Sequence, residues 1–382
     1  MRLLHTSDWH VGRTFHGRDL LADQEIVLGA IAELVAAERV DVVVVSGDLY
    51  DRAVPSAEAV ATCTRALSAI RRAGAELVII AGNHDSAQRL GAFAEFAAAG
   101  GLHLRTSVAE LDRPVLLRDE YGLLACYGIP YLEPDPARHA LGRPELRGHA
   151  GVLGEAMNRV RADLAERGPD VRSVVLAHAF VTGAAPSESE RTIAVGGVED
   201  VPAAVFDGVD YVALGHLHGA QTLAEHLRYA GSPMAYSFSE ARQRKSVWLV
   251  DLGRDGLADV RRHELPVPRR LATVRGELDE LLADPANENV VDCYLYAILT
   301  DSVRPLDAMR RLHERFPFTV RLDWLPDGES ERPAPRYSTH GRDDAAVAEE
   351  FVLDCRGSTL AEGERGLFVE AFEAVRQLEA RQ

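Results

Sequence analysis

Lysine is almost absent from this chain of 382 residues, because Lys245 is its single lysine and the other 41 basic residues are arginines. A phosphate-binding GxxxxGK[ST] loop needs a lysine directly after a glycine, whereas Lys245 follows Arg244. The chain therefore carries no Walker-type ATP site of its own. A lysine Schiff base could form only at Lys245. Any step that consumes ATP must be supplied by another chain.

Cysteines and long hydrophobic runs are also scarce. The four cysteines lie far apart and form no CxxC pair, which excludes a disulfide framework and favours buried thiols. No apolar run approaches the ~18 residues of a membrane helix. The N-terminal stretch MRLLHTSDWHVG reaches polar residues too soon for a signal peptide. We therefore expect a cytoplasmic protein without a membrane segment.

Acidic residues exceed basic ones by 59 to 42, which gives a net charge of −17. With 47% hydrophobic and 26% charged residues, the composition is that of a soluble globular protein. The length predicts roughly two to three domains. The acidic excess argues at first sight against a stand-alone nucleic-acid binder. However, residues 343–382 alone hold ten acids and four arginines, so much of the excess lies in a tail.

The first two thirds of the chain alternate strand-like and helical segments. Short apolar runs are expected to form strands at 2–6, 41–46, 77–81, 122–128, 173–178 and 211–215. Segments rich in Ala, Leu and Glu are expected to form helices near 19–39, 56–73 and 86–99. Continuous Val/Ile/Leu runs indicate strands buried on both faces, and the alternation indicates an α/β fold. Further short strands are expected at 221–223, 227–230 and 246–251.

Changes in composition predict four parts. They are a main domain at 1–268, a small module at 269–325, a linker at 326–342 rich in Pro, Gly, Ser and charge, and a helical segment at 343–382. In the small module we expect a helix at 277–282, a strand at 290–299, a helix from Pro305 and a strand at 318–324.

The tail at 343–382 predicts two helices, broken around Gly357 and Ser358. The second helix has an apolar face formed by Leu367, Phe368, Ala371, Phe372, Val375 and Leu378. Such a face either folds back on the body or docks on a partner, and both possibilities stay open.

Five polar clusters each follow or end an apolar run. They are Asp8-Trp9-His10, Gly47-Asp48, Gly82-Asn83-His84-Asp85, His178 and Gly215-His216-Leu217-His218. Functional groups of α/β sheets gather outside the carboxyl ends of the strands, so we expect the five clusters to converge on one crevice. Each cluster alone is typical of an ordinary turn or cap. All five in this order favour a metal site.

The residue types in these clusters match a site for two metal ions. Carboxylates, imidazoles and one amide oxygen suit Mn²⁺, Fe²⁺ or Zn²⁺ better than Ca²⁺. Asp8 and Asp48 are candidates to neutralise the ions, with one carboxylate bridging. Two ions ~3.5–4 Å apart can activate water and bind the oxygens of an in-line displacement at phosphorus. His84 is placed to reach the phosphate, where it could stabilise charge or protonate the leaving oxygen.

The same motifs resemble those of the calcineurin-like metallophosphoesterase family. This resemblance implies a sandwich of two mixed sheets flanked by helices, with a dinuclear centre at the strand ends. Further stretches resemble the nuclease subunits of bacterial SbcCD-type complexes, namely 6–12, 195–197, 213–218 and 229–240. The small module would then be a capping domain. The acidic tail would be the segment that binds the coiled coil of the ATPase subunit SbcC.

The resemblance also implies the role of each site residue. One metal ion would be held by Asp8, His10, Asp48 and His218, and the second by Asp48, Asn83, His178 and His216, with His84 as the catalytic histidine. Archaeal and eukaryotic relatives carry a second catalytic histidine just after the Gly-Asp motif. Here Asp51 lies in that neighbourhood, so the role is vacant or filled differently. We expect Asp85 to orient its loop by hydrogen bonds.

The expected function is that of a Mn²⁺-dependent DNA phosphodiesterase in recombination, repair and replication. By resemblance it would be an exonuclease on duplex ends and an endonuclease on single strands and hairpins. It would work as a homodimer, with two copies of the chain and two of SbcC in the complex.

Two alternatives remain. A small-molecule phosphoesterase, such as a cyclic-nucleotide phosphodiesterase, would share the metal ligands but has no need of residues 271–382. A non-enzymatic scaffold would be expected to have lost ligands, whereas all seven positions are filled.

Three other polar or aromatic features are assigned no role in the chemistry. His5 lies inside the first strand and is expected to be a packed residue. Trp9, between two predicted ligands, is expected to form a wall of the site. The basic cluster from Arg242 to Lys245 is expected to be a solvated turn, although it could contact a DNA backbone.

Overall fold

The computed structural model describes residues 1–190, 201–326 and 361–379, and the single positions 347, 349, 352 and 359. The chain divides into two compact units, Met1–Trp324 and Leu325–Gln382. The predicted linker at 326–342 and the first predicted tail helix lie outside the described residues, apart from single positions.

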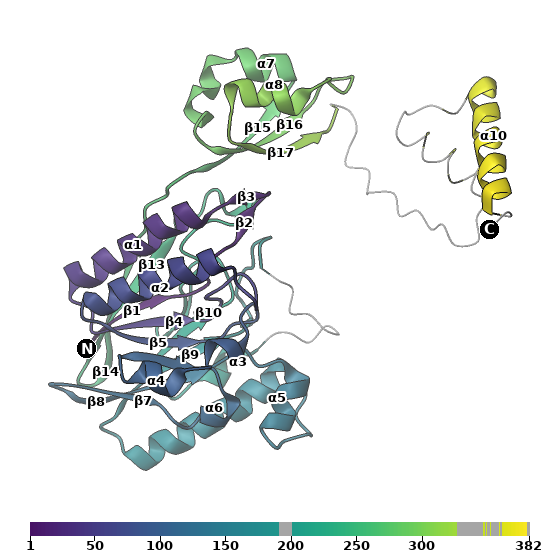
Figure 1. The fold of residues 1–382 in the computed structure, drawn as a ribbon. Coiled ribbons are helices and arrows are strands. Elements are labelled where there is room, and N and C mark those ends of the chain that lie inside the picture. The colour runs from purple at the N-terminus through teal and green to yellow at the C-terminus, as the bar shows by residue number, and fades with distance from the viewer. Residues whose placement is uncertain are drawn as a thin grey trace. The chain divides into compact units, whose positions relative to one another are not determined.

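Two six-stranded mixed sheets form the body of the first unit (Figure 1). The first sheet has the order β14 (Gly256–Glu264), β13 (Ser246–Gly253), β1 (Arg2–Thr6), β4 (Val42–Ser46), β5 (Glu76–Ile80) and β6 (Leu102–Arg105). The second has the order β11 (Gln221–Ala224), β12 (Leu227–Tyr229), β10 (Tyr211–Gly215), β9 (Arg172–His178), β8 (Gly122–Ile129) and β7 (Val115–Asp119). The strands from β1 to β6 and from β12 to β8 run parallel, and antiparallel partners flank them.

Strand β4 explains why the central strands are apolar along their whole length. Val42 and Val44 belong to the core between the two sheets, together with residues of β8, β9 and β10. Val43 and Val45 belong to the core between the first sheet and its helices. Successive side chains of a strand point to opposite faces, so a strand buried on both faces has no polar position to alternate with.

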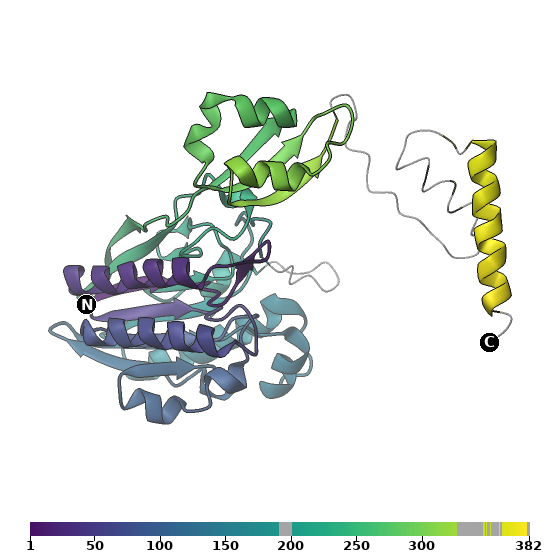
Figure 2. The same cartoon turned by 45° about the horizontal axis from the view of Figure 1, so that its top comes forward.

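Helices cover the outer faces of both sheets (Figures 1 and 2). Residues of α1 (Leu21–Glu38) and α2 (Ala57–Arg72) pack on the first sheet. Residues of α5 (Pro134–Ala140) and α6 (Gly148–Arg167) pack on the second. This is the expected sandwich of two mixed sheets flanked by helices.

The predicted helix at 86–99 is wrong in part, because two short helices replace it. These are α3 (Ala87–Leu90), which ends at Gly91, and α4 (Ala94–Ala98). The elements that were not predicted from the sequence are β2 (Thr14–Phe15), β3 (Arg18–Asp19), β6, β7, β14, β15 (Leu271–Gly276), α5, α6, and the 3₁₀ helices Val108–Glu110, Ala203–Phe206, Phe238–Glu240 and Pro285–Val290.

The small module contains a parallel three-stranded sheet and two helices. Its strands are β15 (Leu271–Gly276), β16 (Tyr294–Leu299) and β17 (Thr319–Trp324), and its helices are α7 (Leu278–Ala283) and α8 (Ala308–Arg315). These elements enclose a hydrophobic cluster of their own, which includes Leu295, Leu312 and Phe316.

Two predicted boundaries in the small module are wrong. The strand expected from residue 290 begins at Tyr294, because Pro285–Val290 forms a 3₁₀ helix. The helix expected from Pro305 begins at Ala308, because Asp307 takes a left-handed conformation with φ of 52°. Leu306, which lies before the first residue of this helix, is 88% exposed.

The second unit contains α10 (Glu362–Glu379). Phe368 and Phe372 lie one turn apart on it, with ring centroids separated by 6.3 Å, and Leu367 is exposed. Across the described parts of both units, no helix is both long and apolar enough to cross a membrane.

Candidate metal centre

The predicted site residues lie where five strands end. Asp8 and His10 follow β1, Asp48 follows β4, Asn83 and His84 follow β5, His178 ends β9, and His216 and His218 follow β10. All of them are buried except Asn83, which is half-buried. Two sheets therefore deliver acids and imidazoles into one enclosed region, where a polar side chain needs a partner to offset its desolvation.

Three groups of side chains could each hold a metal ion. They are Asp8 with His10 and His218, His10 with Asp48 and His84, and Asp8 with Asp48 and His178, and within each group the ligand atoms lie within 4.8 Å of one another. Asp48 belongs to two groups, which suits a carboxylate shared between two ions. The arrangement suggests a site for two divalent metal ions.

The other two predicted ligands lie beside the third group. The Oδ1 atom of Asn83 is 2.8 Å from Nε2 of His178. The ring of His216 meets the ring of His178 edge-on, with the centroids 5.3 Å apart, but His216 belongs to none of the three groups. Asn83 therefore contacts His178 directly, whereas His216 lies beside the ring of His178 and outside the three groups.

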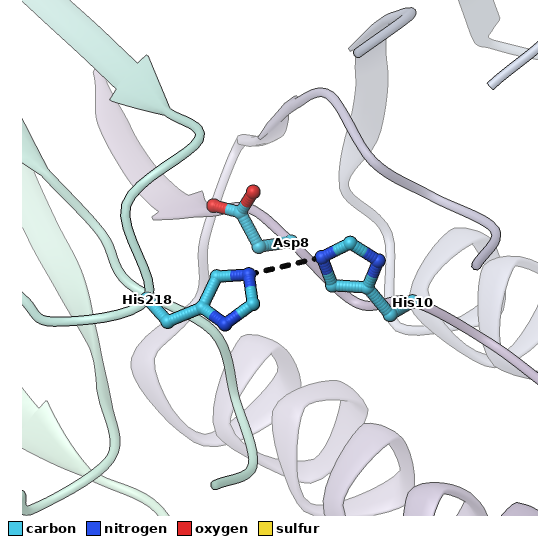
Figure 3. A group of neighbouring side chains, drawn as sticks. All are labelled: Asp8, His10 and His218. Carbon is cyan, nitrogen blue, oxygen red and sulfur yellow. Dashed lines mark hydrogen bonds between the residues drawn. The ribbon is translucent and has the colours of Figure 1, made fainter. Parts of the chain in front are cut away.

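His10 and His218 give a direct test of whether a cation fits. Their Nε2 atoms are 3.0 Å apart beside Asp8 (Figure 3), and both rings are fully buried. Within the described part of the chain, Nδ1 of His10 has no hydrogen-bond partner. Two imidazole nitrogens and a carboxylate that meet in a buried place are a typical donor set for a borderline divalent cation. The donors fit.

His178 is held by its other nitrogen. Its Nδ1 donates a hydrogen bond to the backbone oxygen of Ser46 over 2.8 Å. Its Nε2 therefore faces Asn83 and the carboxylate of Asp48, whose Oδ2 is 3.4 Å away. A metal-binding histidine is commonly oriented by a hydrogen bond to its second nitrogen, and the backbone of β4 supplies that bond here.

The backbone around the site is strained. Four of the predicted ligands have positive φ angles, which are 54° at Asp8, 46° at His10, 50° at Asp48 and 104° at His216. Hydrogen bonds between the loops hold this conformation, for example from the backbone nitrogen of Asp8 to the oxygen of Gly47 over 3.0 Å. Residues other than glycine rarely adopt such angles, and strain of this kind concentrates at functional sites.

Asp85 joins two of the ligand loops. Its carboxylate accepts hydrogen bonds from the backbone nitrogens of Gly82, Leu49 and Tyr50 at 3.0, 3.1 and 3.0 Å. The prediction that Asp85 orients its loop by hydrogen bonds is confirmed. Burial and the nearby charge of Asp48 raise the pKa of Asp85 to about 6.

His84 is held by both neighbouring loops. Its backbone nitrogen donates to Oδ1 of Asp48 over 2.8 Å, and its Nδ1 lies 2.8 Å from the backbone oxygen of Asp51. This bond assigns a proton to Nδ1, so chemistry at this ring passes through Nε2. The carboxylate of Asp51 lies 3.7 Å from His10 and from Arg13. Asp51 thus supports two histidines of the cluster.

Burial and charge set the protonation of the cluster. Burial raises the pKa of Asp8 to about 6. Burial opposes ionisation of Asp48 too, but His178 and His10 hold its pKa well below the usual value. Burial lowers the pKa of His10 strongly and that of His216 to about 3. His178 differs, because Asp48 outweighs burial and raises its pKa to about 9.

The residues that surround His218 were not predicted from the sequence. Ser189, Glu190 and Glu240 all contact this histidine or its backbone. Ser189 and Glu190 come from a loop without regular structure, and no pattern in the sequence relates them to residue 218. Ser7 was also missed, and its hydroxyl donates to Asp8 over 2.5 Å.

The three features that were assigned no role in the chemistry have different outcomes. His5 is a packed residue as predicted, buried against the hydroxyl of Tyr211 and the backbone oxygen of Leu214. Trp9 is buried in the core behind the site, where its Nε1 donates to Thr6 over 2.9 Å. The prediction of a solvated basic turn is wrong for Lys245, because its side chain is only 5% exposed.

Comparison with known proteins gives two family matches. The model of the calcineurin-like phosphoesterase family matches residues 1–220. A second model, SbcD_C, described as the type 5 capsule protein repressor C-terminal domain, matches residues 267–354. The second match begins at the joint between the body and the small module.

Two solved structures are among those that align with the chain. One is a dimetal phosphatase from Danio rerio, with 13% identity over 70% of this chain and 99% of that chain, at a TM-score of 0.42. The other is a psychrophilic beta-glucosidase from Micrococcus antarcticus, with 12% identity over 84% and 83% of the two chains, at a TM-score of 0.20.

Proposed function

The chain belongs to the calcineurin-like phosphoesterase family, and from this premise we propose that it is a metal-dependent DNA nuclease of the SbcD type. It hydrolyses phosphodiester bonds, as an exonuclease on duplex ends and an endonuclease on single strands and hairpins. The metal ions are two Mn²⁺ ions, and the biological context is DNA recombination, repair and replication.

One observation carries this proposal. Asp48 belongs to two of the three groups of side chains that could hold a metal ion, one that includes His10 and one that includes Asp8 and His178. A carboxylate in that position can be shared by two cations. Two adjacent cations are the arrangement that suits displacement at phosphorus.

The residues of the chain divide the chemical work. Bound divalent ions supply charge stabilisation and a water molecule of lowered pKa. Asp8, His10, Asp48 and His218 would hold one ion, and Asp48, Asn83, His178 and His216 would hold the other. His84 acts on the phosphate through Nε2, stabilising charge in the transition state or protonating the leaving oxygen.

The surroundings of the cluster support a polyanionic substrate. A cavity of about 260 Å³ is lined by Arg13, His16 and Tyr236 of the body and by Arg321 of β17, together with Glu188 and three further residues of the body. The ring of Tyr236 packs against His10, with centroids 5.5 Å apart, and Arg13 lies over the same ring at 4.9 Å. Arginines near a reaction centre suit the phosphates of a nucleic-acid strand. A cyclic nucleotide does not need the arginine contributed by the small module.

The decisive experiment compares substrates on the purified chain with Mn²⁺. We expect cleavage of single-stranded and hairpin DNA, and loss of this cleavage in an Asp48→Asn variant. His263→Ala, an exposed position on β14, is the matched control and should cleave like the parent. Cleavage of cyclic nucleotides with both DNA substrates left intact, with and without an SbcC subunit, would favour the small-molecule alternative and end the nuclease proposal.

An ATPase of the SbcC type is the proposed partner, in a complex of two SbcC and two nuclease subunits. Support comes from the absence of a Walker loop, the match at 267–354 and the helix α10 with its pair of phenylalanines. We predict that deletion of residues 343–382 abolishes association with SbcC and spares the cleavage of short single strands. Co-purification and a fluorescent oligonucleotide assay measure the two effects. If the truncated chain still bound SbcC, the tail would have to fold back on the body instead.

A further inference from the structure

The only lysine of the chain is buried beside the metal cluster. The ammonium group of Lys245 lies 2.5 Å from Oε2 of Glu240, 2.8 Å from the backbone oxygen of His218 and 3.0 Å from the hydroxyl of Ser232. It also lies 2.9 Å from the side-chain oxygen of Gln243. A buried ammonium is costly unless it is paired and hydrogen-bonded, and here every partner is an oxygen acceptor. A compact point charge suits these four converging acceptors better than the planar guanidinium of arginine.

Glu240, the partner of this lysine, is completely buried. Its Oε2 atom forms a buried ion pair with the ammonium group of Lys245, and this pairing keeps the carboxylate ionised. Its Oε1 atom accepts a hydrogen bond from the hydroxyl of Ser189. An ionised carboxylate can only accept hydrogen bonds. The proton between Ser189 and Glu240 therefore belongs to the serine.

The direction of this hydrogen bond also determines which atom is the donor in the bond between Ser189 and His218. The hydroxyl oxygen of Ser189 lies 2.5 Å from Nδ1 of His218. Since a hydroxyl has one proton, and Ser189 gives it to Glu240, Nδ1 of His218 must be the donor in the second bond. His218 therefore carries its proton on Nδ1 and presents the lone pair of Nε2 toward His10 and Asp8. That is the tautomer a metal ligand needs at this nitrogen.

The backbone of His218 is held by the same surroundings. Its nitrogen donates to Oε1 of Glu190 over 2.8 Å, and its oxygen accepts from Lys245. The imidazole, the backbone nitrogen and the backbone oxygen of His218 are therefore all held by hydrogen bonds to residues that are not predicted metal ligands.

We propose that Lys245, Glu240 and Ser189 are positioning residues that hold His218 in the tautomer that binds metal through Nε2. The proposal rests on the proposed function, in which His218 is a metal ligand. Hydrogen bonds link the ammonium of Lys245 to the carboxylate of Glu240, the carboxylate to the hydroxyl of Ser189, and the hydroxyl to the imidazole of His218. We call this series of bonds the relay. Partners of this kind typically change metal affinity by ~10–100-fold when they are removed.

The test uses the hydroxyl, because its removal leaves the buried ion pair intact. In a Ser189→Ala variant we expect the affinity for Mn²⁺, measured by isothermal titration calorimetry, to fall ~10–100-fold. Ser189→Thr keeps a hydroxyl and should restore most of the affinity. Ser302→Ala, at an exposed serine of the small module, is the matched control. Nitrogen-15 spectra of histidine-labelled protein without metal should show His218, identified by its absence in His218→Gln, losing its Nδ1-protonated signature only in Ser189→Ala.

The outcomes separate this inference from the proposed function. If the parent chain bound no Mn²⁺ or did not cleave DNA, the proposed function would fail first. If the parent bound two Mn²⁺ ions and Ser189→Ala bound them as tightly, with the tautomer unchanged, the relay would be refuted. Equal loss of affinity in Ser189→Ala and Ser189→Thr would also refute it, because packing at position 189 would then matter and the hydroxyl would not. Unfolding curves for all variants show whether any loss comes from a damaged fold.

Discussion

The ring of His84 lies where it could serve either as a catalytic group or as a ligand. It forms a possible metal group with His10 and Asp48, and its Nδ1 is bonded to the backbone oxygen of Asp51. Only Nε2 can therefore meet a phosphate or an ion. The proposed role on the phosphate requires that metal binding survive without this ring.

The substitution His84→Ala tests this role. We predict that cleavage falls by ~10²–10⁴-fold, as for loss of a general acid or of a charge-stabilising group. The metal content, measured by inductively coupled plasma mass spectrometry after equilibration with Mn²⁺, should stay near two ions per chain. If the variant bound only one ion, His84 would be a metal ligand. If the variant cleaved DNA as fast as the parent, His84 would have no role in catalysis.

Protons compete with metal ions at His178. Its pKa of about 9 lies above the ordinary value of 6.5, so the ring is protonated at pH 7 and must release a proton before Nε2 can bind an ion. Asp8, with a pKa of about 6, adds a second competing proton only at lower pH. His10 and His216 are neutral at pH 7 because their pKa values are lowered.

The affinity for Mn²⁺ is therefore predicted to rise with pH between about 6 and 9, by about tenfold per pH unit where one proton is displaced. Calorimetry at pH 7 in buffers with different ionisation enthalpies should detect the release of about one proton. A His178→Asn variant should show a flatter dependence on pH. An affinity that stayed constant across this range would contradict the assignment of His178 as a protonated ligand.

At the scale of elements, the loops after β4 and β5 approach so closely that a side chain cannot fit between them. A Cβ atom at Gly82 would lie 2.2 Å from Oδ1 of Asp48 and 2.4 Å from its backbone nitrogen. A methyl group there would have to push apart the two loops that carry Asp48 and His84.

We predict that Gly82→Ala lowers the free energy of unfolding by ~1–3 kcal/mol, the usual cost of overpacking, and weakens metal binding as well. Gly29→Ala is the matched control. Gly29 lies inside α1, and a Cβ there would meet no described atom within 4 Å, so alanine should be neutral or stabilising by up to ~1 kcal/mol. Urea denaturation measures the free energy of unfolding of both variants. Equal stability of the two variants would contradict the close approach of the loops.

Elements were predictable where local pattern and burial agree. The apolar run of β4 is buried on both faces, so its strand and the polar turn after it could be located from the sequence. The break between α3 and α4 was missed because the segment at 86–99 has the composition of one helix. The start of α8 was missed because aspartate, although enriched among left-handed residues, adopts that conformation at only a small share of its positions.

The same distinction holds for the site. The predicted ligands follow strands and could be found by position, whereas their supports could not. The bond from His84 to Asp51 uses a backbone oxygen, which every residue has. Ser189 and Glu240 are 51 residues apart, and their contact is created only by the tertiary fold.

At the scale of the whole molecule, two aromatic side chains that are close together in the sequence are largely exposed. Phe93 is 77% exposed and Phe96 is 84% exposed, both in the segment of α4. Exposed aromatic residues this close together are typical of a protein contact. We expect them to form part of the proposed homodimer interface.

A double variant Phe93→Asp, Phe96→Asp is predicted to weaken self-association by at least ~100-fold, as for loss of interface hot spots. Sedimentation velocity over a range of concentrations measures the change. Ile26→Asp, at a position on α1 that is 55% exposed, should leave self-association unaltered. If the double variant sedimented as the parent does, the homodimer would need another surface.

The net charge of −17 also belongs to this scale. Six units of it lie at 343–382, and Asp8 and Asp48 are proposed to be offset by metal ions. The positive electrostatic potential of Arg13 and Arg321 can therefore attract a phosphate backbone, although the chain is acidic overall. We expect the chain alone to hold duplex DNA weakly, with much of the affinity supplied by its partner.

The burial of Lys245 has a practical consequence for studying such a partner. Because it is the only lysine and its ammonium is enclosed by Glu240 and its neighbours, the surface presents no lysine amine to reagents. Crosslinkers and dyes that couple to lysine side chains will therefore report on the other protein of a mixture. Lysine acetylation or ubiquitination would have to unfold this corner of the molecule first. Mapping of contacts on this chain must instead use its carboxylates, its arginines or introduced cysteines.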